Sequence, residues 1–232
     1  CRLAVVRAAG ELYGTAVADV AGAAFEAVGI TTGTTTNYLG NLSPNPGTDF
    51  ILCTLVNYSR IDMANGNGVV LGTMYNRPIK SKPSMRDNGR EFVFVNADGH
   101  IIGGTLVYNG TNITPQFMEL SEEPVWANAA ISKDGRYIAA LRDTSENLVF
   151  VFDLLSGTSR VFRLYNPTTS QNGTKSGDVR YADVLEFDYS GQYIMYDAYN
   201  EIIGVSETIN YWDIGFLQFR SKGQWADNTN PF

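Results

Sequence analysis

The stretch AAISKDGRYIAAL at residues 129–141 decides the fold, because the chain carries it a second time, in altered form, as VLEFDYSGQYIMYDA at residues 184–198. In both copies a short apolar strand leads through a polar turn to a glycine, Gly135 or Gly191, and a second apolar strand follows. Such a repeated strand–turn–strand pattern predicts a series of similar small sheets.

Two earlier stretches follow the same plan. NLSPNPGTDFILCTLV (41–56) turns at Gly47 and KPSMRDNGREFVFV (82–95) turns at Gly89, so the four turn glycines are 42, 46 and 56 residues apart. Three of the copies continue to an aspartate on the next strand. These aspartates are Asp62, Asp153 and Asp213. We interpret them as structural, because one catalytic site would not need a copy in each repeat, whereas an aspartate at a strand end can accept hydrogen bonds from a turn.

Most of the chain after residue 48 consists of segments rich in β-branched and aromatic residues, which predict strands. These segments are DFILCTLV (49–56), REFVFV (90–95), HIIGGTLVY (100–108), RYIAALR (136–142), NLVFVFDL (147–154), SRVFRLY (159–165), QYIMYDA (192–198) and TINYWDI (208–214). Pairs that tolerate positive φ lie between them, at Asn65-Gly66, Asp98-Gly99, Asn109-Gly110, Asp134-Gly135 and Ser156-Gly157.

The repeat predicts an all-β fold, a β-propeller of four-stranded antiparallel blades. One such unit cannot cover both faces of its own sheet, so successive units must pack against each other, and radial stacking leaves only short edges. We expect one propeller or propeller segment over residues 1–232. Its blade-like units are expected at 41–78, 79–124, 125–180 and 181–232, after a partial unit at 1–40.

The N-terminal stretch is expected to contribute strands. RLAVVRAAGELYG (2–14) is read as strand, turn and strand, and VADVAGAAFEAVG (17–29) as strand or loop, because Gly22 interrupts its apolar spacing. A short helix is the alternative for the second segment. Cys1 allows three interpretations: the lipid-carrying residue of a mature bacterial lipoprotein, the start of a fragment, or a lost beginning. The lack of a polar tether after Cys1 favours a fragment.

The copy AAISKDGRYIAALRDTSENLVFVFDLLSG (129–157) resembles the WD40-like β-propeller repeat of the TolB type. The residues that carry the resemblance are Ser132, Asp134, Gly135, Arg136 and Tyr137 in the first half and Asp153, Leu154 and Gly157 in the second. The match is moderate at 184–214 and weaker at 84–108 and 41–73, and it covers residues 41–217 in all.

The resemblance implies a binding platform, or the non-catalytic partner of a peptidase domain, in a periplasmic, secreted or cell-surface bacterial protein. A closed propeller needs at least about four blades and often six to eight. Four copies and a partial unit therefore predict a segment of a larger propeller, with a five-bladed ring closed by N-terminal strands as the competing arrangement.

Composition argues against a nucleic-acid partner. The net charge is −7 and the pI is near 4.7, whereas nucleic-acid binders usually present a basic face. The only dense basic stretch consists of Arg77, Lys80, Lys82, Arg86 and Arg90, and we interpret it as a solvated loop and turn. No apolar run approaches the ~20 residues that span a bilayer, so no transmembrane segment is expected.

The sequence offers no catalytic, cofactor or metal site. His100 is the only histidine, and no Gly-x-Ser-x-Gly motif occurs. Zinc would need several histidines or cysteines, and the chain has two cysteines. The acidic cluster of Glu119, Glu122 and Glu123 is interpreted as a solvated loop between blades.

Aromatic residues are the best binding candidates. Tyr199, Tyr211, Trp212 and Phe216 lie in the longest repeat, which follows the polar segment 165–183. We therefore expect a non-catalytic scaffold that presents loops to a protein or glycan partner, at the cell envelope or outside the cell. The alternatives are an accessory domain of a larger hydrolase or peptidase, and a structural surface protein anchored by lipid at Cys1.

Overall fold

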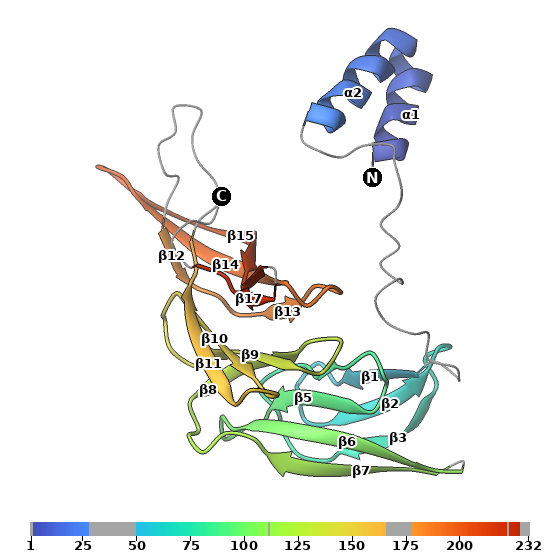
Figure 1. The fold of residues 1–232 in the computed structure, drawn as a ribbon, viewed down its shortest axis with the longest axis vertical. Coiled ribbons are helices and arrows are strands. Elements are labelled where there is room, and N and C mark those ends of the chain that lie inside the picture. Colours follow the sequence, from blue (N-terminus) through green and yellow to red (C-terminus); the bar gives the residue numbers. More distant parts are fainter. Residues whose placement is uncertain (1, 28–49, 111, 166–177, 222, 228–232) are drawn as a thin grey trace. The chain divides into compact units, whose positions relative to one another are not determined.

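The structure is a computed structural model that describes residues 2–27, 50–110, 112–165, 178–221 and 223–227 (Figure 1). The chain divides into two compact units, Cys1–Gly40 and Asn41–Phe232. The first unit contains the described helices and the second contains the described strands.

The described residues 2–27 are helical, so the strands expected there are wrong, and α2 agrees with the short helix given as the alternative for the second segment. α1 spans Arg2–Tyr13 and α2 spans Thr15–Ala27. Alanine is the best helix former and is abundant in both segments. Arg7 and Glu11, one helical turn apart, form an ion pair of 2.7 Å on the surface of α1.

The break between the two helices is a glycine. Gly14 has a φ of +88°, and its N–H donates to the carbonyl of Gly10 at 3.0 Å, which ends α1. A Cβ added at Gly10 would lie 3.5 Å from the Cβ of Ala18, so small residues set the contact of the two helices. Residues 2–27 therefore supply no strand to a fifth blade, and the ring closed by N-terminal strands is excluded for the described part of that segment.

The described residues of the second unit form four successive antiparallel sheets of three or four strands and one two-stranded piece, which confirms the predicted fold class. Sheet 1 contains β1 (Phe50–Thr54), β2 (Ile61–Asn65) and β3 (Val70–Tyr75). Sheet 2 contains β4 (Ser84–Met85), β5 (Glu91–Val95), β6 (Ile101–Asn109) and β7 (Asn112–Glu119). Sheet 3 contains β8 (Trp126–Ile131), β9 (Tyr137–Arg142), β10 (Leu148–Asp153) and β11 (Thr158–Arg163).

Sheet 4 contains β12 (Asp178–Tyr181), β13 (Leu185–Phe187), β14 (Tyr193–Ile203) and β15 (Thr208–Gln218). β12 and β13 both pair with β14, and β15 pairs with β14 along its whole length. A two-stranded piece, β16 (Arg220–Ser221) with β17 (Gln224–Trp225), follows. In sheets 2 and 3 the strands lie in chain order, as a meander.

The repeated turn has the same backbone in each described copy. Gly89, Gly135 and Gly191 all have positive φ, and each donates its N–H to the carbonyl three residues earlier, at 2.8–3.1 Å. The position of Gly47 lies outside the described residues. Positive φ is costly for other L-residues, so these turns explain why glycine recurs. At the turn after β2 the positive φ lies at Gly68, not at Gly66 as the Asn-Gly pair suggests.

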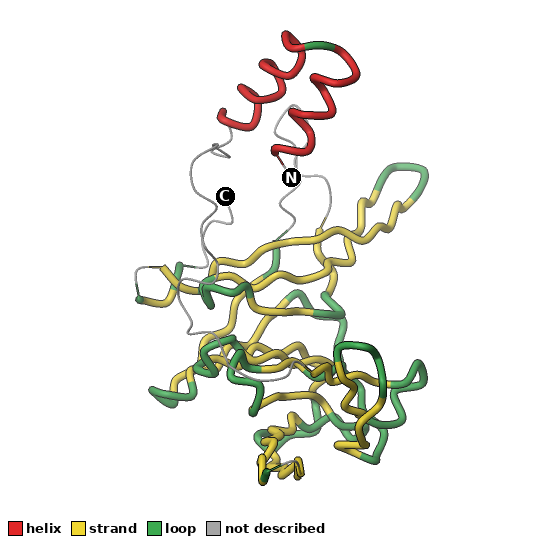
Figure 2. Tube along the Cα trace, turned by 90° about the vertical axis from the view of Figure 1, so that its right-hand side faces the viewer, coloured by secondary structure: helices red, strands yellow, loops and turns green. Residues whose placement is uncertain are grey.

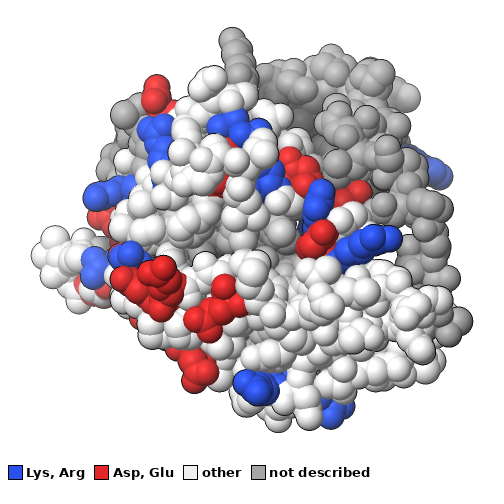
Figure 3. Space-filling view, turned by 60° about the horizontal axis from the view of Figure 1, so that its bottom comes forward, with Lys and Arg blue, Asp and Glu red and all other residues white. Residues whose placement is uncertain are grey.

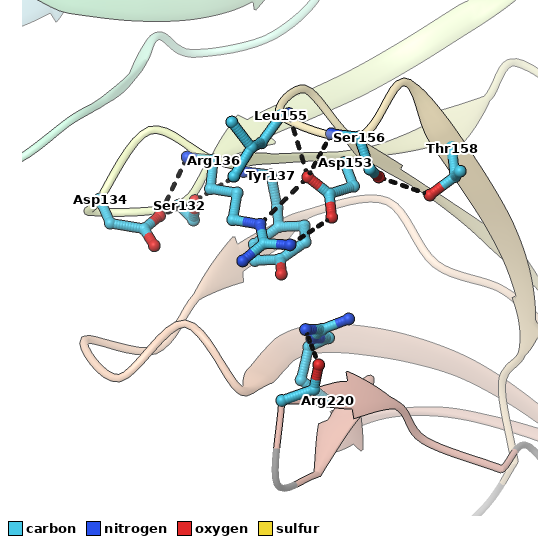
Figure 4. A network of polar contacts seen from close by, with 10 residues as sticks. Ser132, Asp134, Arg136, Tyr137, Asp153, Leu155, Ser156, Thr158 and Arg220 are labelled. Atoms are coloured by element: carbon cyan, nitrogen blue, oxygen red, sulfur yellow. Dashed lines mark hydrogen bonds and ion pairs between the residues drawn. The ribbon is translucent and has the colours of Figure 1, made fainter.

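Polar side chains close the turn of sheet 3 (Figure 4). Asp134 Oδ1 accepts hydrogen bonds from Ser132 Oγ at 2.6 Å and from the N–H of Arg136 at 3.0 Å. Asp153, at the end of β10, accepts from Arg136 Nη2 at 2.7 Å and from the N–H of Leu155 at 3.0 Å. These bonds, that of Arg136 first, hold the pKa of the buried Asp153 carboxyl well below its usual range.

Asp62, like Asp153, accepts hydrogen bonds within its own sheet, as predicted, but its partners differ. It accepts from Thr73 Oγ1 at 2.7 Å and pairs with Arg60 at 2.9 Å, and the Thr73 hydrogen bond is the main reason that its pKa is lowered. Asp213 accepts a hydrogen bond of 2.8 Å from the N–H of Ile214. The three recurring aspartates therefore act locally on the strands and turns that carry them.

Three apolar cores join the sheets in sequence, as the successive layers of strands in Figure 2 indicate. In sheet 3, Ile138 and Ala140 pack towards sheet 2, whereas Ala139 and Leu141 pack towards sheet 4. The contacts among sheets 2, 3 and 4 run mainly through β4, β5, β8, β9 and β13, whereas sheets 1 and 2 touch through β3 and β7. Small antiparallel sheets that pack on one another in succession are the blades of a propeller.

Candidate protein-binding face

The strand register shows which face of sheet 4 is not covered by another sheet of the described residues. In sheets 2 and 3, the residue four positions after the turn glycine is fully buried under the next sheet: Val93 is 1 % exposed and Ala139 is 0 % exposed. The matching residue of sheet 4 is Met195, whose exposure is 44 %. Its neighbour Ile194 points the other way and is buried against sheet 3.

We call this exposed surface the aromatic face. Its members share the outer side of the β14–β15 hairpin, including the adjoining β12, because side chains alternate along a strand. They are Tyr181, Met195, Tyr199, Trp212, Ile214 and Phe216. The last three are 50 %, 60 % and 55 % exposed. Cross-strand pairing places Met195 opposite Phe216, and Tyr199 opposite Trp212.

Three of these rings form a preassembled cluster. The ring centroids of Tyr181 and Tyr199 are 5.0 Å apart, and Trp212 lies 5.7 Å from the first and 5.2 Å from the second. Tilted and edge-on contacts in this range are favourable. The cluster holds its rings in place before any partner arrives, so little side-chain entropy is lost on binding.

Two carboxylates on the same face are already engaged within the sheet. Asp197 accepts hydrogen bonds from the N–H groups of Asp183 and Val184, at 2.8 and 2.7 Å. Glu201 pairs with Arg180 at 3.5 Å. The face therefore offers mainly apolar and aromatic contact, and its carboxylates serve the sheet itself.

The structure brings together three of the four aromatic residues that the sequence singled out. Tyr199, Trp212 and Phe216 lie on the aromatic face, whereas Tyr211 lies on the opposite side of β15. Sequence reasoning missed Met195 and Ile214. The turn-glycine offset could have identified Met195, since it depends only on counting residues from Gly191. Cys1 and most of the polar segment 165–183 lie outside the described residues.

His100 has a local role in sheet 2. Its Nδ1 lies 3.1 Å from the carbonyl oxygen of Ser121 and 3.3 Å from Glu119 Oε1, and the Ser121 hydroxyl accepts the N–H of Ile101 at 2.9 Å. Glu122 and Glu123 are exposed. Among the described residues, no group of three or more histidine, cysteine, aspartate or glutamate side chains is placed to hold a metal ion. Neither described helix has the length and apolar character needed to cross a membrane.

Charges are mixed rather than segregated. On the face drawn in Figure 3, basic side chains are scattered among acidic ones. Within the basic stretch 77–90, Lys80 pairs with Asp143 at 2.8 Å and Arg86 with Glu91 at 3.3 Å. This arrangement fits the interpretation of the stretch as loop and turn between strands.

Comparisons with known proteins were made with both sequence and structure. No protein-family model and no curated protein matches the sequence. Hsv2 of Kluyveromyces lactis is similar in structure at 12 % identity and a TM-score of 0.39, over 66 % of this chain and 46 % of that one. The C-terminal WD40 domain of Sif2 is similar at 14 % identity and a TM-score of 0.36, over 75 % and 44 %.

A protein of unknown function from Bacteroides thetaiotaomicron is similar at 9 % identity and a TM-score of 0.41, over 66 % of this chain and 38 % of that one. The present chain thus spans less than half of each of these three structures. The fold is established by four successive antiparallel sheets that pack on one another through three apolar cores, and three of these sheets share the glycine turn, at Gly89, Gly135 and Gly191. The described residues between 50 and 227 have the architecture of β-propeller blades, within which the WD40-like and TolB-type assignments stay predictions.

Proposed function

We propose that this protein is a non-catalytic propeller scaffold that binds a protein partner through the aromatic face. The observation that carries the proposal is Met195, which is exposed at the register position where sheets 2 and 3 bury Val93 and Ala139 under a neighbouring sheet. The face is as apolar as the faces that other sheets bury, yet it is exposed. Large exposed apolar patches mark interaction sites.

The chemistry of the face favours a protein over a glycan. Sugar hydroxyls need free polar groups, but Asp197 and Glu201 are engaged within the sheet. Trp212 and Tyr199 are of the residue types that carry most binding energy at protein interfaces. Beside them, Met195 adds a flexible side chain that can adjust to a partner, and Ile214 adds aliphatic surface. The partner is therefore expected to insert apolar side chains between these residues.

A photo-crosslinking amino acid at position 214 tests the proposal in the cells that make the protein. We expect a defined adduct with a second polypeptide, and we expect Trp212→Ala with Phe216→Ala to reduce its yield at least fivefold, since interface anchors of this kind contribute roughly 1–2 kcal/mol each. Val161→Ala on β11, which removes a side chain of 44 % exposure, is the matched control. An adduct that survives the double substitution unchanged contradicts the proposal.

The location at the cell envelope or outside the cell is part of the same proposal and rests on the TolB-type resemblance. Digestion of intact and permeabilised cells with an added protease tests it, because an exported chain is reached in cells whose inner membrane is intact. The lipid attachment at Cys1 is a separate expectation. The mass of the N-terminal peptide checks it, and an unmodified cysteine contradicts it.

A further inference from the structure

A cleft of about 480 Å³ lies between the outer strands of sheets 1 and 2. One wall comes from the end of β3 and the residues that follow it, and the other comes from the end of β7. β3 and β7 touch each other at this edge of the two blades. The cleft is distinct from the aromatic face, which belongs to sheet 4.

The interior of the cleft is apolar. Met74 and Ile102 are buried in the core between sheets 1 and 2, and both line the cleft. The rings of Tyr75 and Phe117 form its sides, with centroids 5.0 Å apart and planes inclined at 67°. Met118 lies at the rim and is 65 % exposed. An aromatic or branched apolar side chain is the natural occupant of such a space.

Hydrogen-bond donors without a partner in the described part of the chain line the same cleft at Asn96 and Arg77, beside the exposed amide of Asn76. Asn96 is only 9 % exposed, and its Oδ1 accepts the N–H of His100 at 2.8 Å, while its Nδ2 has no partner among the described residues. Arg77 is exposed and forms neither a hydrogen bond nor an ion pair with any described residue. Its charge acts on the Tyr75 hydroxyl, where it partly offsets the rise in pKa that burial causes.

One oxygen of the carboxylate at the rim lies beside a histidine. Glu119 lines the cleft, but its Oε1 lies 3.3 Å from His100 Nδ1. Asp98 also acts on Tyr75, although it is not among the lining residues. An unpaired guanidinium and a free amide N–H₂ beside an apolar interior call for a ligand that brings a carboxylate next to an apolar group.

We propose that the cleft between β3 and β7 binds the C-terminal end of a peptide, with the last apolar side chain against Phe117 and the carboxylate at Arg77 and Asn96. Such a ligand satisfies both donors and fills the apolar interior at once. Peptide termini are recognised elsewhere by the same combination of a donor set and a side-chain pocket.

The test uses N-acetyl-phenylalanine and its amide, which differ only in the carboxylate, in NMR titrations of the whole chain. We expect the acid to shift the side-chain N–H₂ signal of Asn96 and to bind about threefold to fivefold more tightly than the amide, as a partly exposed charge pair allows. Arg77→Gln should abolish this preference and leave the affinity for the amide unchanged. Met118→Ala should weaken both compounds.

Arg163→Gln is the matched control, because it removes the same charge from an exposed position on β11. Equal affinity for acid and amide overturns the proposal, as does a preference that survives Arg77→Gln, or the absence of saturable shifts at the cleft at about 10 mM ligand. All substituted side chains are exposed, so loss of folding does not confuse the result.

Discussion

At the residue scale, the clearest physical device is the buried Asp153, whose pKa is lowered chiefly by its hydrogen bond from Arg136. A carboxyl with a lowered pKa stabilises the fold above its unfolded value of about 3.9, and that stability is lost as the pH falls further. Asp153→Asn should cost on the order of 1 kcal/mol at neutral pH, because water screens the partly exposed Arg136. Urea unfolding at pH 7 and pH 3 measures the free energy of unfolding of the original protein and of Asp153→Asn. We expect the two values to differ less at pH 3 than at pH 7. An equal difference at both pH values would contradict the stabilising role of the Asp153 carboxylate.

At the element scale, two phenylalanines on or just after β15, Phe216 and Phe219, should contribute very differently to the stability of the fold. Phe219 is fully buried in the core between sheets 3 and 4, whereas Phe216 is on the aromatic face. Deleting a buried phenylalanine costs about 3–5 kcal/mol, whereas an exposed one costs little. Phe219→Ala should therefore lower the thermal midpoint by many degrees and Phe216→Ala by almost nothing, as scanning calorimetry can measure. Equal effects would mean that the aromatic face is part of the folded core.

At the scale of the second unit, the four sheets form a row of nearest-neighbour contacts. Sheets 2 and 3 are each buried on both faces against neighbouring sheets, so their strands β5 and β9 should open only in global unfolding. Hydrogen exchange should be slowest in β5 and β9 and much faster at the tip of the β14–β15 hairpin, residues 203–208. Exchange in β5 or β9 as fast as at the hairpin tip would contradict this order.

Much of the architecture follows from local sequence. The predicted strands are present, and Gly89, Gly135 and Gly191 occupy turns with positive φ, because few other residues tolerate that backbone. The N-terminal expectation was wrong for a reason of the same kind: Ala-rich helices with small apolar residues lack a distinct period, and the choice between helix and strand depended on contacts such as that of Gly10 with Ala18.

The sequence by itself determined that sheets of one design succeed one another, since strand alternation and turn chemistry act between near neighbours in the chain. Only the tertiary structure decided which sheet face stays exposed among the described residues and which groups meet in the cleft. Trp212 and Tyr211 are adjacent in sequence but lie on opposite sides of β15, and Arg77 and Phe117 come from different blades. Whether a strand residue is buried depends on which other sheet packs against that strand, and the residues of the strand alone do not specify that sheet.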